Sequence, residues 1–140
     1  MSYPKTLTFV AANLTNEVAD VNFVLLDESG GVKSTFRRTD KHSDAARYLL
    51  DVKRQAPKRS GDNLGVRKSA IKLTIDEDVA LRTEGTVQSA ALMSLDFNVP
   101  VGLSSETVTT MIEIMSEMLV SYKASFIAQA TIGDINVVDA

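Results

Sequence analysis

The sequence predicts an α+β fold, with an antiparallel sheet first along the chain and helices grouped at the C-terminus. Two observations lead to this prediction. Up to residue 99, apolar and polar residues alternate as in half-buried strands, and beyond Gly102 the period becomes about 3.6 residues, as in a helix. At 140 residues the chain is expected to form one domain, 1–140, with a hairpin region (1–31), a main sheet (32–99) and helices (103–132).

Residues 1–31 are predicted to form a β-hairpin region that ends in a turn. Segments 6–12 (TLTFVAA) and 21–26 (VNFVLL) are rich in β-branched and aromatic residues, and a polar segment connects them. The sequence DESGG at residues 27–31 is a strong turn signal. We therefore expect the chain to return as a strand over residues 32–38.

Three later segments share one pattern, an apolar face opposite a polar face. They are residues 47–54 (RYLLDVKR), 66–76 (VRKSAIKLTID) and 90–99 (AALMSLDFNV). A loop is predicted over residues 56–65, and a polar, mobile connection over residues 76–87. The apolar faces are expected to pack in the core and carry Tyr48, Leu50, Val52, Ile71, Leu73, Ile75, Met93, Leu95, Phe97 and Val99.

One long amphipathic helix follows the predicted strands. Its apolar residues recur at i, i+3 and i+4 spacing, namely Val108, Met111, Ile112, Met115, Leu119 and Tyr122. Ser104 or Ser105 can cap its N-terminus, and a shorter helix over residues 125–130 would end at Gly133. These helices are too small to cover the apolar face of a sheet of about five strands. A second subunit would supply the missing cover, so we expect an obligate dimer.

The basic residues are concentrated in one part of the chain. Twelve of the fifteen lie between Lys33 and Lys72, together with only four acids, so that this segment carries a net charge of +8. The remaining hundred residues carry −11, and the overall charge of −3 results from cancellation. Such an asymmetry indicates a polyanionic partner, although a solvated basic surface is an equally good explanation at this stage.

The sequence offers little for catalysis or metal binding. It has no cysteine, and its only histidine, His42, lies in a turn-like sequence between Asp40 and Asp44. The glycines do not form a phosphate-binding loop. We therefore expect no catalytic residue, no metal site and no cofactor. The chain also lacks an apolar stretch of about eighteen residues and a signal-peptide pattern, which favours a cytosolic protein.

Three segments, taken in order, carry a resemblance to a known family. They are RYLLDVKRQ (47–55), VRKSAIKLTI (66–75) and ALMSLDFNVPVGLSSETVTTMIEIMSEMLV (91–120). In the last segment, an alternating strand ends in an apolar residue and a proline and runs within a few residues into an amphipathic helix. In these features, in size and in element order, the chain resembles the levivirus-like coat (capsid) proteins of small single-stranded RNA bacteriophages.

The resemblance implies an N-terminal β-hairpin, a five-stranded antiparallel sheet and two C-terminal helices, in an interlocked homodimer. Such dimers form a small icosahedral shell whose sheets face the genome, and the loop joining the last two strands, here residues 76–88, closes the vertices. The implied protein is structural and non-enzymatic, and it belongs to the virion, which assembles in the cytoplasm of the bacterial host. Its implied partners are single-stranded viral RNA, further copies of itself and a minor maturation protein, with no membrane partner.

The same resemblance places the RNA contacts on the polar faces of the strands. The expected RNA-binding residues are Arg47, Asp51, Lys53, Lys68, Lys72, Ser94 and Asn98. Where the family has small hydroxyl residues in a base pocket, this sequence has Leu49, Asp51 and Ala70, and Leu92 replaces a stacking tyrosine. General packaging through phosphate contacts is therefore expected. Repression of translation through an RNA hairpin would depend on the altered positions.

Two other interpretations are open at this point. A dimeric nucleic-acid-binding regulator would use the same basic face to bind RNA without forming a shell. An enzyme acting on a phosphorylated substrate would also need basic residues, but the sequence shows neither a nucleophile nor a metal site for it. Particle formation separates a capsid protein from the regulator, and turnover by the pure protein would indicate the enzyme.

Overall fold

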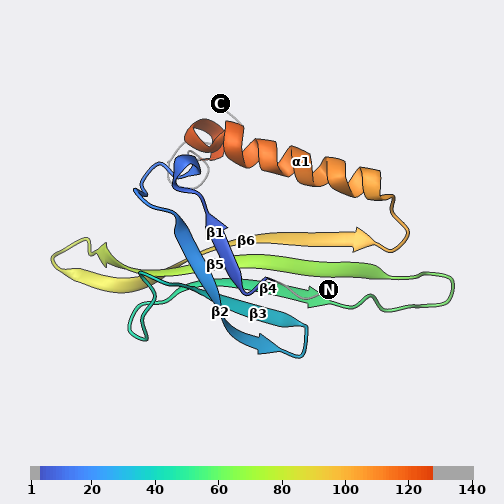
Figure 1. The fold of residues 1–140 in the computed structure, drawn as a ribbon, viewed down its shortest axis with the longest axis horizontal. Coiled ribbons are helices and arrows are strands. Elements are labelled where there is room, and N and C mark those ends of the chain that lie inside the picture. Colours follow the sequence, from blue (N-terminus) through green and yellow to red (C-terminus); the bar gives the residue numbers. More distant parts are fainter. Residues whose placement is uncertain (1–3, 128–140) are drawn as a thin grey trace. The chain divides into compact units, whose positions relative to one another are not determined.

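The computed structural model describes residues 4–127, which contain a six-stranded antiparallel sheet and one α-helix (Figure 1). The strands are β1 (Thr6–Phe9), β2 (Val21–Ser29), β3 (Lys33–Arg38), β4 (Tyr48–Gln55), β5 (Val66–Ala80) and β6 (Thr86–Pro100). The helical elements are the 3-10 turn η1 (Ala11–Asn13), the helix α1 (Ser105–Ser121) and the π-helical turn η2 (Lys123–Ile127). The predicted α+β class is confirmed.

The chain divides into two compact units, residues 1–98 and residues 99–140. The first unit contains the sheet, in which every strand pairs with the next one along the chain, in the order β1-β2-β3-β4-β5-β6. The register between β4 and β5 places Tyr48 opposite Ile75 and Val52 opposite Ile71. This register aligns the apolar faces of β4 and β5, as their alternation predicts.

The N-terminal part of the sheet differs from the prediction. The hairpin of β1 and β2 belongs to the same sheet as the other strands, so the sheet has six strands where we expected a hairpin beside five. Strand β2 also continues through Asp27 and Glu28, which we expected in the turn, and a register shift after Leu25 accommodates this extension. Gly30 and Gly31, with φ angles of 55° and 69°, make the turn instead.

The expected mobile connection over residues 76–87 is largely strand. Strand β5 runs on to Ala80 and β6 begins at Thr86, and the Leu81 amide donates a 3.0 Å hydrogen bond to the Gly85 carbonyl. The prediction was wrong because a hairpin exposed on both faces has no buried face to impose an alternation of apolar and polar residues, and its composition therefore resembles that of a loop. The connection is confined to residues 81–85.

The core of the first unit lies on one face of the sheet. Its buried residues are Val21, Phe23 and Phe36. Partly buried side chains packed against them are Leu7, Leu14, Leu25, Tyr48, Leu50, Val52 and Leu73, which confirms the predicted inward face of β4 and Leu73 in β5. On β6, Met93 is 65% exposed and Leu95 is 36% exposed, so the predicted apolar face of this strand is not covered within the described chain. The core is centred on β2 and β3, and β6 lies at the far edge of the sheet.

The second unit contains α1, whose start agrees with the prediction. Ser104 is the N-cap, and its Oγ accepts a 3.2 Å hydrogen bond from the Thr107 amide. None of the residues of α1 is buried, and Met111, Ile112 and Met115 are about half exposed. Of the shorter helix expected over 125–130, the described chain contains only the end of η2, and residues 128–130 and Gly133 lie outside the described residues.

Candidate nucleic-acid interface

The face of the sheet opposite the core carries a group of cationic side chains, which we call the basic face and define by Lys33, Arg37, Lys53, Lys68 and Lys72. These residues share a face because side chains directly opposite each other on paired strands point to the same side. Lys33 lies opposite Lys53, and Arg37 lies opposite Leu49. On β5, Lys72 lies opposite Asp51 and Lys68 lies opposite Gln55. Three strands thus contribute cations to one surface.

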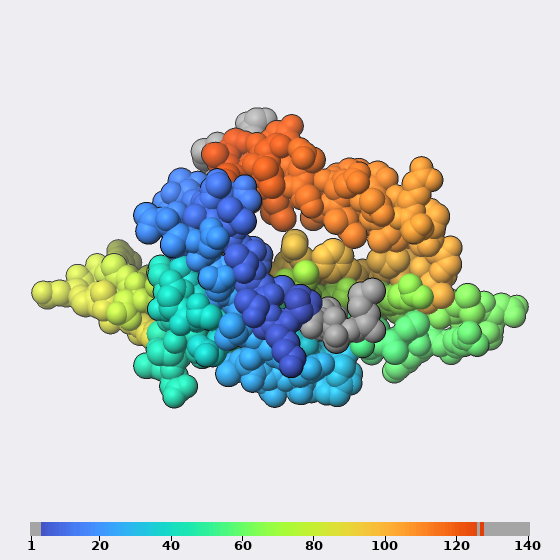
Figure 2. Space-filling model, viewed as in Figure 1, coloured from blue at the N-terminus to red at the C-terminus, as the bar shows by residue number. Residues whose placement is uncertain are grey.

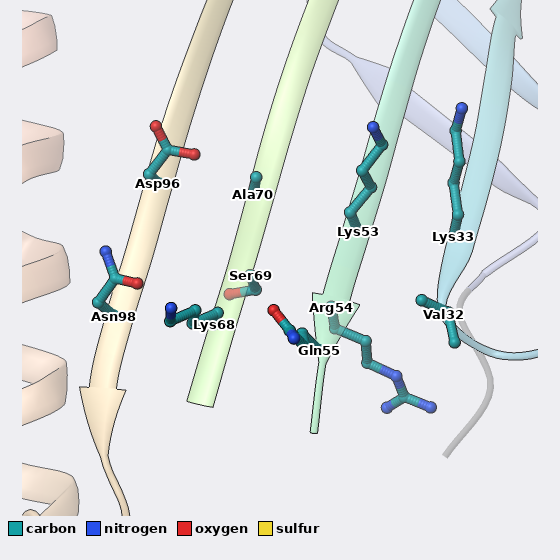
Figure 3. Close-up of a pocket in the computed structure, with 10 residues that line it drawn as sticks. All are labelled: Val32, Lys33, Lys53, Arg54, Gln55, Lys68, Ser69, Ala70, Asp96 and Asn98. Carbon is teal, nitrogen blue, oxygen red and sulfur yellow. The ribbon is translucent and has the colours of Figure 1, made fainter. Parts of the chain in front are cut away.

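A shallow groove of about 750 Å³ crosses the basic face (Figure 3). Figure 3 shows Lys33, Lys53, Ala70 and Asp96 following one another across β3, β4, β5 and β6. Further residues that line the groove are Val32, Arg54, Gln55, Lys68, Ser69 and Asn98. Among the lining residues, Asp96 is the one acid against four basic side chains. The groove is therefore a cationic surface open to an extended anionic ligand.

Five of the sequence-predicted residues lie together on this face. Lys53 and Lys68 are exposed, Lys72 is half-buried, and Asn98 lines the groove. Ser94 is exposed, and it shares the face with Asn98 because the two are four residues apart on β6. The structure thus brings these five side chains to one surface, as the alternation of the strands predicts.

Asp51 lies on the same face but is buried, with 7% of its surface exposed. Its Oδ1 accepts a 2.6 Å hydrogen bond from the Thr35 hydroxyl and lies 3.8 Å from the Lys33 Nζ. Lys72, on β5, lies directly opposite Asp51. Asp51 is therefore placed to hold Thr35 and Lys33 in position rather than to contact a ligand directly.

Arg47 is bound to a carboxylate at the start of β4. Its Nε donates to Asp76 Oδ2 at 2.8 Å and its Nη2 donates to Asp76 Oδ1 at 3.1 Å, while its backbone amide also donates to Oδ2 at 2.9 Å. The hydrogen bond from the Arg47 side chain is the main cause that lowers the pKa of Asp76. Arg47 therefore fastens β4 to β5, and its charge is neutralised locally.

Two cationic residues of the basic face were absent from the predicted set. Lys33 and Arg37 belong to β3, where they alternate with Ser34 and Phe36. The two-residue period of the sequence VKSTFRR contains this information, because Phe36 marks the core face and places both cations on the other face. The alternation of β3 relative to Phe36 therefore predicts that Lys33 and Arg37 lie on the basic face.

Arg38 is counted among the clustered basic residues of the sequence, yet it lies on the core face with 2% of its surface exposed. Its Nη1 and Nη2 each donate to Glu17 at 2.9 Å, and its Nε donates to Asp40 at 2.7 Å. The guanidinium carbon lies 4.8 Å from the centre of the Tyr48 ring. Hydrogen bonds from Arg38 are the main cause of the lowered pKa values of Glu17 and Asp40. Arg38 therefore has a structural role.

The remaining candidates for chemistry also have structural roles. His42 Nδ1 accepts a 3.1 Å hydrogen bond from the Tyr48 amide, which fixes the turn before β4. Within residues 4–127, no three His, Asp or Glu side chains are grouped so that they could hold a metal ion. Over the same residues, no helix is both long and apolar enough to cross a membrane.

Comparisons with known proteins identify the fold. No protein-family model and no curated protein sequence matches the chain. A chain of the virus-like particle of Beihai levi-like virus 32 is 19% identical, with a TM-score of 0.69 over 83% of this chain and 88% of that chain. For the virus-like particle of bacteriophage AVE019, the identity is 14% and the TM-score 0.71, over 96% of this chain and 99% of that chain.

A third solved structure, the bacteriophage GA protein capsid, is 18% identical, with a TM-score of 0.56 over 82% of this chain and 84% of that chain. At these identities the likeness concerns the fold. The chain therefore has the fold of a levivirus-like coat protein, as its resemblance in sequence predicted.

Proposed function

We propose that this chain is a structural, non-enzymatic capsid protein that dimerises, assembles into a small icosahedral shell and packages single-stranded RNA on its basic face. The observation that carries the proposal is the fold, which it shares over most of its length with chains of solved capsids and virus-like particles. The shell would form in the cytoplasm of a bacterial host and would include a minor maturation protein. Repression of translation by binding an RNA hairpin is the least supported part, because Leu49, Ala70 and Leu92 differ from the family pattern.

The basic face supports the packaging role. Lys53, Lys68 and Lys72 come from two neighbouring strands, and Lys33 adds a cation from a third. Contacts of this kind bind phosphates without reading bases, and their affinity falls as salt increases. Many weak contacts repeated over a shell can therefore hold a long RNA.

Exposed apolar surface supports the dimer. Strand β6 has 15 residues and is the last strand of the described sheet, so one of its edges has no strand partner there. Met93 and Leu95, on the apolar face of β6, are 65% and 36% exposed, and in α1 Ile114 and Val120 are 62% and 68% exposed. A second copy that pairs with β6 and contributes its own α1 would bury these residues and produce the interlocked homodimer.

Electron microscopy of the purified recombinant protein tests the proposal, together with its absorbance ratio at 260 and 280 nm after nuclease treatment. Uniform spherical particles with protected nucleic acid are the expected result. A protein that stays dimeric at high concentration with RNA present, and binds that RNA, would be the non-capsid regulator instead. Sedimentation after mild disassembly checks the dimer, since the expected product is a dimer and a stable monomer would contradict it.

A further inference from the structure

The two ends of β5 carry opposite charge. Around the turn at residues 81–85, the exposed acids Glu77, Asp78 and Glu84 form what we call the acidic tip, in which Arg82 is the one cation. At the other end, the loop over residues 56–65 and the adjoining strand ends form what we call the basic end. The exposed cations that define the basic end are Arg54, Lys58, Arg59 and Arg67, against one acid, Asp62.

These two regions cannot meet within one chain. Strand β5 has 15 residues, which corresponds to a length of about 50 Å between its ends. Figure 1 shows the turn after β5 and the loop before it on opposite sides of the sheet, and Figure 2 shows both ends projecting from the first unit in opposite directions. The complementary charges can therefore meet only between two copies.

The basic end also has a shape that suits a hairpin tip. A groove of about 560 Å³ lies there, lined by the cations Arg54, Arg67 and Lys68, by the apolar residues Val32, Ala56 and Pro57, and by Gly30, Gly31, Gln55 and Ser69. The Arg54 Nε donates a 2.6 Å hydrogen bond to the Gly31 carbonyl, which fixes the arginine at the wall of the groove.

The acidic tip has the matching composition, because the side chains of Val79 and Leu81 beside its acids are 49% and 47% exposed. A tip with acids and exposed apolar side chains is thus complementary to a groove lined by both cations and apolar residues.

The direction of the side chains separates part of the basic end from the basic face. Arg54 lies opposite Ser69, so Arg54 and Arg67 extend from the core side of the sheet, whereas Lys53 and Lys72 extend from the other side. Arg54 and Lys68 line both grooves, so RNA is the competing occupant of the basic end, and the charge reversal below distinguishes it from the acidic tip. The acids of the tip outnumber its one cation, Arg82, so two tips repel each other and the basic end of a neighbour is their complement.

We propose that the acidic tip of one copy docks into the groove at the basic end of a second copy. The contact joins different surfaces of the two copies, so it is heterologous, and in a closed shell it would be repeated around the symmetry axes. It rests on the proposed capsid function and adds to it the contact that links one dimer to the next.

Charge reversal tests the contact in the full-length protein. One variant reverses the tip (Glu77→Arg with Glu84→Arg), a second reverses the basic end (Arg59→Glu with Arg67→Glu), and a third combines all four changes. Glu28→Arg, an exposed acid on β2, is the matched control. We expect each reversal alone to lower the yield of particles about tenfold while dimers persist, and the combined variant to recover most of the yield.

A wild-type yield of particles from both the tip variant and the basic-end variant would overturn the proposal. So would a combined variant whose yield of particles is no higher than that of either of these two variants. Loss of RNA without loss of particles in the basic-end variant would assign that groove to RNA and equally overturn it. If the wild type forms no particles at all, the proposed capsid function fails, and the contact is tested separately. The measurement is then the concentration-dependent association of dimers. If each reversal does not weaken this association, or the combined variant does not restore it, the proposed contact is wrong.

Discussion

Arg37 and Arg38 are adjacent arginines whose side chains lie on opposite faces of β3 and serve different purposes. Arg37 belongs to the basic face, whereas Arg38 is buried between Glu17, Asp40 and Tyr48. Alternation along the strand predicts that they diverge. It does not predict that Arg38 is neutralised, because its bidentate partner Glu17 is 21 residues away in the sequence and comes from the connection between β1 and β2.

Replacing Arg38 is therefore expected to destabilise the fold. In Arg38→Met the carboxylates of Glu17 and Asp40 lose their shared cation, and the connection over residues 11–20 loses its attachment to β3. We expect the free energy of unfolding to fall by about 2 kcal/mol, which is moderate because both acids keep access to water. Urea denaturation of disassembled protein measures this change.

Arg37→Met is the matched control, because Arg37 is the same residue type one position away on the other face. We expect it to change the free energy of unfolding by less than about 0.5 kcal/mol. Equal destabilisation by the two substitutions would show that the cluster around Arg38 contributes nothing specific.

At the scale of elements, the alternating segments were predicted well where one face is buried. Strands β3, β4 and the first part of β5 each carry residues of the core on one side, so the two-residue period is visible in their sequences. The strand residues on either side of the turn at 81–85 were missed because residues 77–89 are exposed throughout, and no burial imposes a pattern on them. Backbone pairing between β5 and β6, rather than side-chain packing, stabilises these parts of the two strands.

The loop between β4 and β5 depends on Gly65. Its φ angle is +89°, and a Cβ at this position would lie 2.4 Å from the Lys58 carbonyl oxygen. We expect Gly65→Ala to lower the free energy of unfolding by about 2 kcal/mol and to open the loop over residues 56–65. Urea denaturation and limited proteolysis in this loop measure the two effects.

Gly61→Ala is its control, since Gly61 also has a positive φ angle of +60° but has open space where a Cβ would be. Gly61→Ala should lower the free energy of unfolding by about 1 kcal/mol, because it adds only backbone strain. If Gly61→Ala and Gly65→Ala lower the free energy of unfolding equally, the close approach of Lys58 is unimportant.

At the scale of the whole molecule, the basic face leads to a prediction about RNA content. Lys68→Ala with Lys72→Ala removes two of the cations of that face from β5, and neither residue belongs to the core. Particles of this variant should hold about half of the wild-type RNA, because phosphate neutralisation depends on the number of cations. The absorbance ratio of nuclease-treated particles, at equal protein concentration, gives the content.

The control for this prediction is Lys5→Ala with Arg82→Ala, which removes two exposed cations outside the basic face. It should leave the RNA content unchanged. An equal RNA content in particles of the Lys68, Lys72 variant and the wild type would remove the basic face from the packaging role.

Charge clustering in the sequence anticipated the basic face, but it placed too many residues there. Arg38 and Arg47 are each held by carboxylates, and Arg54 and Arg67 point to the other side of the sheet. The count of charges along the chain could not separate these groups, because only the register of the strands assigns each side chain to a face. The sequence similarly shows apolar residues on β6 and α1 without showing which surface covers them.

The order of the strands has a kinetic consequence. Because every strand of the sheet pairs with its predecessor, each hairpin can close as soon as its second strand has left the ribosome. The sheet therefore does not need to wait for the C-terminal residues before it forms. Synthesis can deliver a nascent chain whose β1 to β5 are already paired while α1 is still being translated, so that subunit association becomes the last step of maturation.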